Sequence, residues 1–382
     1  MILLLTNLKK YEVTMYGARH QEKYNCKPKH VNIYLLREEL QRSNSENFNQ
    51  QKMLLKNQVT QLLSKSPKHY YFSTPLFKQW FITNALHILR WVFILDRLLI
   101  KSKPAVMIVQ SEASIHGGIL GLLSKKYNIP FINMPLLLIG DRTIIPTRAD
   151  YYFVWGSNQK KWFMERNTKE NKIFETGNIK FFCELERSIC SKKYFLNELN
   201  IPAHHHIFGF TSQPFPDANG RIEEWINAIP NHLPVTILVK KHKNDPHEYP
   251  ILNGKPNIRI LPPDYALYEF LAHIDCLMTI SSNTAIEAAL VDKPLLILQP
   301  PIPYHYQLNH NQNNAHLVKA QAGEIIESAN HLVTSIKKVI INSEYRNELK
   351  RKAGKFLSRT LAAVDEAPIL TKSKIVEIIS KN

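Results

Sequence analysis

Short apolar, β-branched runs alternate with amphipathic helical patterns along most of the chain. In the first half, this alternation predicts strands at 2–6, 31–36, 106–110, 131–135, 151–155 and 173–176. Helical spacing between them predicts helices at 79–101, 117–127 and 159–167. Strands that alternate with helices in this way are typical of parallel sheets covered by helices.

A second series of the same kind begins near residue 200. It predicts strands at 206–210, 235–239, 258–261, 276–280 and 295–298, with helices at 222–229, 266–273 and 283–290. From Gly323 onward the pattern is helical to the end. The predicted fold class is α/β, with two Rossmann-like domains that face each other across a cleft. We expect an N-terminal domain over 1–182, a charged linker over 183–200, a C-terminal domain over 201–360, and a final helix over 361–382 that packs back on the first domain.

The most apolar stretch, Trp80–Ile100, is about as long as a membrane-spanning helix. It contains His87, Arg90, Asp96 and Arg97, which would be costly inside a bilayer. We therefore predict an amphipathic helix whose buried face is formed by Phe81, Ala85, Ile88, Val92, Leu95 and Leu99. The polar segment 37–70 is weakly periodic and predicts a helix with a loop.

The net charge of the chain indicates which kind of partner it binds. The 382 residues include 49 Lys or Arg against 32 Asp or Glu, a formal net charge of +17. This excess indicates an anionic partner, such as a nucleotide, a lipid headgroup or a nucleic acid. Basic pairs are dispersed along the sequence with no recognised nucleic-acid module, so nucleic-acid binding is disfavoured.

Cysteine and histidine usage argues against a metal site. The four cysteines are scattered without a CxxC pair, which suits a reducing, cytoplasmic location. His204, His205 and His206 lead into a predicted strand, where neighbouring side chains point to opposite faces and cannot share one ion. We expect no metal and no resident cofactor.

The turn after the predicted strand 276–280 carries the clearest candidate chemistry. Ser281, Ser282, Asn283 and Thr284 stand where a helix begins, so hydroxyls and backbone N–H groups there could bind a pyrophosphate. Glu287, one turn later, could accept hydrogen bonds from ribose hydroxyls. The alternative is that Thr284 and Glu287 form only a capping box.

Two further turns belong to the same predicted sheet. Lys240, Lys241 and His242 follow an aliphatic strand, and a bound phosphate would relieve the repulsion between the lysines. His242 is also a catalytic candidate, because the pKa of an imidazole lies near working pH and its ring could donate to a phosphate or to a leaving-group oxygen. The alternative is a solvated basic loop. Thr211 and Ser212 end the first strand of this domain and would permit close approach of a donor group, although such residues are also ordinary in loops.

The first domain offers one candidate for acid–base chemistry. Glu112 and His116 follow the predicted strand 106–110, at the glycine-containing entry to a helix. A carboxylate or an imidazole there could act as general base on an acceptor hydroxyl. The alternative is that they cap the helix.

Four stretches together resemble a known family. They are 103–109 with Ile129-Pro130, the segment Ala149–Gly156 with Thr176-Gly177-Asn178, the strand end Val239-Lys240-Lys241-His242, and Ser281–Glu287 with Lys293-Pro294. In order and spacing they are similar to GT-B-fold glycosyltransferases of bacterial surface (capsular or lipopolysaccharide) polysaccharide biosynthesis. Lys243 stands where that family usually has proline after the histidine.

The resemblance implies a nucleotide-sugar donor on the C-terminal domain and a polysaccharide or lipid-linked acceptor on the N-terminal one. The chain has no Asp-x-Asp motif, which is consistent with metal-independent transfer. An anionic membrane is a further expected partner, with Trp80, Trp91 and Phe93 as candidate contacts and a peripheral location on the inner face of the membrane. The alternative is that the helix with these residues is buried in the core.

Other functions share these features. A nucleotide-sugar 2-epimerase or a polyol-phosphate transferase of the same fold would use similar turns, and a non-catalytic nucleotide-binding relative would keep them without turnover. Transfer needs an acceptor, whereas epimerisation does not.

Overall fold

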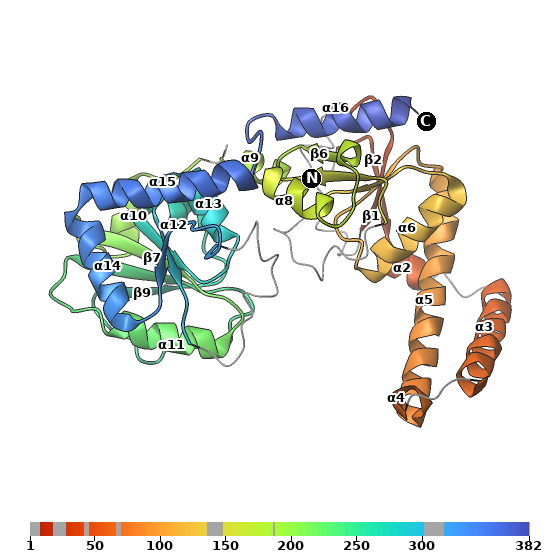
Figure 1. Ribbon diagram of the computed structural model, residues 1–382, viewed down its shortest axis with the longest axis horizontal. Helices are drawn as coiled ribbons and strands as arrows, with labels where there is room; N and C mark the ends of the chain where they lie inside the picture. The colour runs from red at the N-terminus through yellow and green to blue at the C-terminus, as the bar shows by residue number, and fades with distance from the viewer. Residues whose placement is uncertain are drawn as a thin grey trace. The chain divides into compact units, whose positions relative to one another are not determined.

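The computed structural model describes residues 8–17, 28–41, 46–65, 70–135, 148–185, 188–301 and 317–381. The predicted strand at 2–6 lies outside the described residues. Two compact units emerge (Figure 1). The first unit contains the described residues up to 135, together with residues 148–153 and 368–381. The second unit contains the described residues between 154 and 367. The linker predicted at 183–200 and the domain limits given above stay predictions about the chain's organisation.

The first unit has parallel strands, as predicted. Strands β1 (Val13–Gly17) and β2 (Val31–Leu35) pair with each other. A second sheet has the order β3 (Met107–Val109), β4 (Phe131–Asn133), β5 (Tyr151–Val154) and β6 (Ile173–Glu175), of which β6 groups with the second unit. The helices are α2 (Leu36–Gln41), α3 (Glu46–Lys65), α4 (Tyr70–Ser73), α5 (Pro75–Ser102), α6 (Ile115–Tyr127) and α16 (Ala367–Ser380). Strand β1 is not among the strands predicted from the sequence.

Helix α5 is the long amphipathic helix that the sequence predicts. Thr74 caps it by accepting a hydrogen bond from the Phe77 N–H, and proline occupies its first turn. The predicted buried face is only partly right. The buried residues are confined to the last third of the helix, at Ile94, Leu95, Leu98 and Leu99, whereas Ile88 is 41% exposed. Along its earlier turns, α5 packs chiefly against α3 and α4, which leave its side chains half-buried or exposed.

The second unit contains a six-stranded parallel sheet in the order β12-β11-β10-β7-β8-β9. The strands are β7 (His206–Thr211), β8 (Val235–Lys240), β9 (Ile258–Leu261), β10 (Cys276–Thr279), β11 (Leu295–Leu298) and β12 (Glu324–Ile326). Five of them match predicted strands. The prediction that the chain is helical from Gly323 onward is wrong at β12, whose sequence Glu-Ile-Ile begins with a charged residue and is followed within a few residues by a helical pattern.

Helices cover both faces of this sheet (Figure 1). Side chains alternate along the strands, so Phe208 packs with one set of helices and Ile207 with the other. The helices of the second unit are α8 (Ser157–Met164), α9 (Ile179–Leu185), α10 (Lys192–Glu198), α11 (Pro216–Asn227), α12 (Leu267–His273), α13 (Thr284–Leu290), α14 (Ala329–Ile341) and α15 (Ser343–Thr360). The inner strands β8, β10 and β11 are buried on both faces, which explains why their sequences are almost continuously apolar.

Candidate functional site

The order of the six-stranded sheet identifies where a ligand would bind. If β7 is counted as strand 1 and β12 as strand 6, the order across the sheet is 6-5-4-1-2-3. This is the order found in dinucleotide-binding sheets. Ligands in such sheets bind at the carboxyl ends of the strands, where the order reverses. Here that point lies between β7 and β10. The three turns predicted to bind phosphate follow β7, β8 and β10, and therefore share this edge.

Threonine hydroxyls span the point of reversal. Thr211, the last residue of β7, lies opposite Thr279, the last residue of β10, and their hydroxyl oxygens are 3.1 Å apart. The Thr211 hydroxyl is also 3.0 Å from the hydroxyl of Thr284, at the start of α13. Thr211 and Thr284 are residues that the sequence predicts for the site, whereas Thr279 lies inside a predicted strand and is not. These contacts bring two of the predicted turns together.

Backbone groups join the third turn to them. The Ser212 N–H donates to the Lys240 carbonyl oxygen (3.1 Å), and the Ser212 hydroxyl accepts a hydrogen bond from the His242 N–H (2.8 Å). Gln213 extends the connection to the other side, because its side-chain oxygen accepts from the Ser281 N–H (3.2 Å). Ser212 and Gln213 thus connect the loops after β8 and β10. Sequence reasoning missed Gln213, since an amide in a loop carries no local signal of its partner.

The lysines do not crowd together as expected. The Lys240 side chain is largely buried, and its Nζ donates to the Pro263 carbonyl oxygen (3.1 Å). Burial lowers the pKa of Lys240. Lys241 has a different partner, since its Nζ is 3.3 Å from Glu248 Oε1. The expected repulsion is therefore relieved within the chain, by separate partners.

His242 is a neutral hydrogen-bond donor at this edge. Burial and the positive charges of Lys243 and Lys240 lower its pKa, against an opposing effect of Asp245. Its Nδ1 lies 3.1 Å from the Asn244 N–H and accepts its hydrogen bond. Because a neutral imidazole carries one proton, Nε2 is then the protonated ring nitrogen. The ring can donate from Nε2 to an oxygen of a ligand.

The start of α13 differs from the predicted capping box. The residue before the helix is Asn283, which makes no side-chain cap, and the Thr284 N–H donates to the Ser282 hydroxyl (3.2 Å). Ser281, Ser282 and Asn283 are half-buried at the sheet edge. The capping-box alternative is therefore wrong, because Glu287 turns to a different partner. Two of the amides expected to bind phosphate, those of Ser281 and Thr284, already donate to side chains.

Glu287 is a buried carboxylate with one cationic partner. Its side chain is 3% exposed, and Oε1 lies 2.7 Å from the Nζ of Lys180 on α9. Burial raises the pKa of Glu287, and the charge of Lys180 opposes that rise. The Lys180 side chain is 57% exposed, so the pair stands at the boundary between core and solvent. Lys180 is not predicted from the sequence, because it lies 107 residues away along the chain.

A buried polar network supports the loop after β8. Asn219 on α11 donates to the Gln213 carbonyl oxygen (2.6 Å) and to Asp245 Oδ1 (2.9 Å). Asp245 also accepts from the Tyr249 hydroxyl (2.8 Å), whose pKa is raised by burial and by that carboxylate. Glu223, one turn after Asn219, accepts from the Ile251 N–H (2.7 Å). Sequence reasoning missed this network, although polar residues on the apolar face of a helix are a signal that could have found it.

Glu112 lies in the first unit and is almost fully buried. Its carboxylate accepts hydrogen bonds from Asn133 Nδ2 (2.6 Å), from the Ala149 N–H (2.9 Å) and from the Arg148 N–H. Burial raises its pKa, against the effect of these donors. The carboxylate thus joins β4 to the segment before β5. This geometry favours a structural role over direct contact with an acceptor, and the helix is capped by Ser114 instead.

His116 has a different environment. Its ring meets the Trp91 ring edge-on, with centroids 4.4 Å apart, and its Nε2 is buried with no hydrogen-bond partner among the described residues. Burial and the charge of His87 lower the pKa of His116, which favours the neutral imidazole. An unpartnered ring nitrogen makes His116 the better of the two candidates for general base. Trp91 contacts this ring and Phe93 packs against Phe48, and both side chains are half-buried.

The three consecutive histidines have separate partners. His205 Nδ1 lies 3.0 Å from the Thr236 hydroxyl, and His206 Nδ1 lies 4.0 Å from Asp275 Oδ2. The His204 ring packs edge-on against that of His205.

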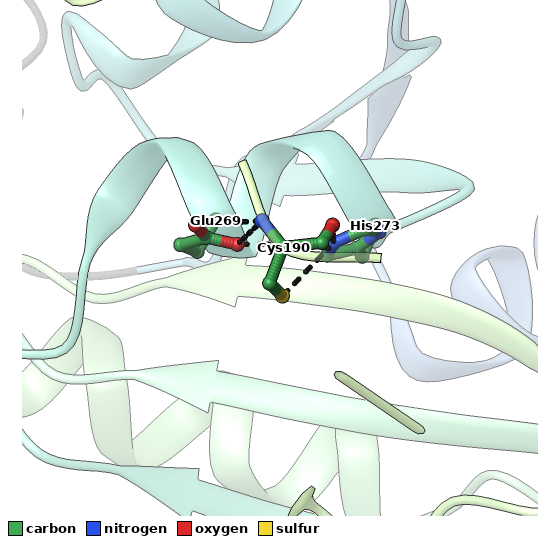
Figure 2. A group of neighbouring side chains, drawn as sticks. All are labelled: Cys190, Glu269 and His273. Carbon is green, nitrogen blue, oxygen red and sulfur yellow. Dashed lines mark hydrogen bonds and ion pairs between the residues drawn. The ribbon is translucent and has the colours of Figure 1, made fainter. Parts of the chain in front are cut away.

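Cys190, Glu269 and His273 form a compact group in the second unit (Figure 2). Their sulfur, carboxylate and imidazole atoms lie within 4.8 Å of one another, and such a set is chemically suited to zinc. However, the Cys190 N–H donates to both Glu269 oxygens (3.0 and 3.1 Å), and His273 Nε2 lies 3.0 Å from the Cys190 carbonyl oxygen. The Glu269 carboxylate raises the pKa of the Cys190 thiol to about 11. The group therefore joins the chain at Cys190 to α12 through its own hydrogen bonds.

Several solved structures resemble this chain over nearly its full length. A UDP-N-acetylglucosamine 2-epimerase superposes with a TM-score of 0.62 at 14% identity, over 99% of this chain and 92% of that one. The UDP-GlcNAc 2-epimerase from Neisseria meningitidis, bound to UDP-GlcNAc, gives 0.56 at 13% identity, over 100% and 96%. The calicheamicin glycosyltransferase CalG4 gives 0.55 at 10% identity, over 100% and 94%.

No protein-family model matches the chain, and no curated protein matches it. At these identities the structural likeness shows the fold. The chain has a GT-B-like α/β fold with two Rossmann-like domains. This confirms the predicted fold class.

Proposed function

We propose that the second unit binds a nucleotide-sugar at the carboxyl ends of β7, β8 and β10, and that the chain is a metal-independent glycosyltransferase. The observation that carries the proposal is the position of Thr211, whose hydroxyl contacts Thr279 and Thr284 across the reversal of strand order. Both classes of similar structure, epimerases and glycosyltransferases, are named for sugar chemistry, and structures bound to UDP or UDP-GlcNAc are among the similar ones.

Several polar groups of this edge suit a diphosphate. The Nε2–H of His242 donates to a phosphate oxygen, and the hydroxyls of Ser281 and Ser282 supply further donors. Lys240 and Lys241 add positive potential, which stabilises the diphosphate as it leaves the sugar. The lysines act through their charge and not through direct hydrogen bonds to the phosphates, because their ammonium groups already have protein partners.

The acceptor side rests on the first unit. His116, neutral and unpartnered at Nε2 among the described residues, is the proposed general base for an acceptor hydroxyl. Glu112 then acts as a positioning residue for β4. The proposed acceptor is a surface polysaccharide or a lipid-linked sugar, of the capsular or lipopolysaccharide type that the sequence resembles.

A thermal-shift screen with UDP, CMP, CDP, GDP and their sugars tests the nucleotide site. A ligand present at about 100 times its Kd stabilises the folded state by about 2.7 kcal/mol, so a true site gives a clear shift. His242→Ala removes a hydrogen bond to a charged group, worth about 1.5–3 kcal/mol, and should weaken binding by about 10- to 150-fold.

His232→Ala is the matched control, because His232 is exposed and precedes β8 instead of following it. The control should bind as the unmodified chain does. A His242→Ala protein with an unchanged shift would remove His242 from the site, and no shift with any nucleotide would overturn the proposal.

A nucleotide-sugar 2-epimerase is the second candidate, favoured by the epimerases among the similar structures. The two reactions separate by their products. Incubation with a nucleotide-sugar alone yields the 2-epimer if the chain is an epimerase. A transferase leaves the configuration at C2 of the sugar unchanged and requires an acceptor.

A further inference from the structure

The hairpin of α3 and α5 carries apolar side chains that nothing in the described structure covers. At its far end, around α4, Tyr70 is 86% exposed, Leu76 82% and Trp80 57%. We call these three residues, with Tyr71 (58% exposed), the hairpin tip. Monomeric soluble proteins seldom expose apolar residues in such a group, and those that do use them to bind a partner.

The tip projects from the body of the first unit. Helix α5 has 28 residues and is therefore about 42 Å long. Its buried residues lie between Ile94 and Leu99, so the packed part is its C-terminal end. Figure 1 shows α3 and α4 along the other part of α5, away from strands β1 and β2. The tip therefore lies at the N-terminal end of α5, far from the part of the helix that packs in the core.

The aromatic residues at the tip hold one another in place. The Phe77 ring packs against those of Tyr71, Trp80 and Phe81, with centroids 5.3, 5.7 and 5.8 Å apart. Tyrosine and tryptophan rings have an apolar body and a polar edge, which suits the boundary between water and the apolar part of a bilayer. The cluster explains how the tip keeps its shape while its outer side chains stay exposed.

The charge of the hairpin identifies the chemistry of the partner. Between Glu46 and Asp96 the sequence contains no Asp or Glu, but it contains Lys52, Lys56, Lys65, Lys68, Lys78 and Arg90. Lys52, Lys56 and Lys65 are exposed on α3. A run of 49 residues with only positive charge, beside exposed aromatic and aliphatic groups, combines the two attractions by which amphipathic helices bind anionic lipid.

We propose that the hairpin tip inserts into the interface of an anionic lipid membrane, with the lysines of α3 against the headgroups. No helix among the described ranges is long and apolar enough to cross a bilayer. The proposed contact is with one leaflet. The proposed surface leaves out Trp91 and Phe93, whose side chains are half-buried, and of the residues expected from the sequence it keeps Trp80, which is exposed.

Flotation of the full chain with lipid vesicles tests this surface. Vesicles of phosphatidylcholine mixed with phosphatidylglycerol should carry the protein, vesicles of phosphatidylcholine alone should carry far less, and added salt should weaken the binding. The double variant Leu76→Glu/Trp80→Glu should reduce flotation at least about tenfold, because it removes two apolar anchors and adds charge that repels the lipid. Lys56→Glu/Lys65→Glu should reduce it selectively for the anionic vesicles.

Matched controls come from the second unit. Ile341 is 82% exposed on α14, and Lys337 is exposed on the same helix, so Ile341→Glu/Lys337→Glu changes similar groups elsewhere. This control should float like the unmodified chain. Far-UV circular dichroism and the nucleotide thermal shift should be the same for all variants, which separates this proposal from the nucleotide site.

Trp80 also serves as a built-in reporter. Of the five tryptophans it is the one with a large exposed fraction, so its fluorescence should shift to shorter wavelength when anionic vesicles are added. Trp80→Phe should float but lose the shift. Equal flotation of the tip variant and the unmodified chain would overturn the proposal. The proposal would also be overturned if the unmodified chain did not float with anionic vesicles. If light scattering then showed a dimer that the Leu76→Glu/Trp80→Glu variant does not form, the tip would be a contact between two copies of the chain.

Discussion

The ion pair of Glu287 and Lys180 sets a pH dependence that can be measured. Burial raises the pKa of Glu287 in the folded chain, so folding disfavours its ionised form. Its contribution to stability is therefore most favourable below the pKa of the unfolded chain and decreases as the pH rises through the folded pKa. Lys180 limits that loss, because its charge favours the carboxylate.

Two substitutions separate these effects. Lys180→Met leaves the carboxylate without its donor and should lower the free energy of unfolding by about 1–3 kcal/mol at pH 8, and by less at pH 4. Glu287→Gln should gain stability relative to the unmodified chain as the pH rises, because it cannot ionise. Urea denaturation at both pH values measures the differences, and a Lys180→Met effect that is equal at both would contradict the assignment.

At the scale of elements, the apolar runs located β7 to β11 to within two residues, because strands buried on both faces need apolar residues throughout. Strands β1 and β12 are not predicted, since their sequences, Val-Thr-Met-Tyr-Gly and Glu-Ile-Ile, are partly polar and give no continuous apolar run. The turns that meet at the sheet edge were also found, because the order of strands and helices places their ends there. Their partners, such as Gln213 and Lys180, were not found, because hydrogen bonds between distant segments leave no local trace.

The packing of strand β7 against α12 requires a glycine at position 209. A Cβ at Gly209 would overlap the ring of Phe270 on α12, so only a hydrogen atom fits between the strand and the helix. Gly209→Ala should therefore lower the free energy of unfolding by about 1–3 kcal/mol, through overpacking.

Gly354→Ala is the control, because Gly354 is exposed in the interior of α15, and a Cβ added there would meet nothing within 4 Å among the described residues. There alanine should stabilise by about 0.5–1 kcal/mol. Thermal or chemical denaturation of both proteins checks the opposite signs. A stable Gly209→Ala protein would show that α12 can move away from β7.

At the scale of the whole molecule, the chain returns to its first unit at the C-terminus, where α16 groups with residues from the beginning. Ile375 is 2% exposed on this helix, and Ile369 is 65% exposed. Ile375→Ala should destabilise by about 2–5 kcal/mol, whereas Ile369→Ala should have little effect.

Hydrogen exchange measured by mass spectrometry would locate the loss. Faster exchange is expected in β3 and β4 of the first unit, with β7 and β10 of the second unchanged. Equal acceleration in both units would show that they unfold as one.

The chain passes from the first unit to the second after Phe153 and back after Ala367, and the stretches next to these two passages are bonded to each other. The Trp155 carbonyl oxygen accepts the Ala362 N–H (2.7 Å), and Asn158 Nδ2 donates to the Thr360 hydroxyl (3.1 Å). Both bonds lie within the second unit, so the segment that begins at Val154 and the segment that ends at Ala367 are fastened to each other without help from the first unit.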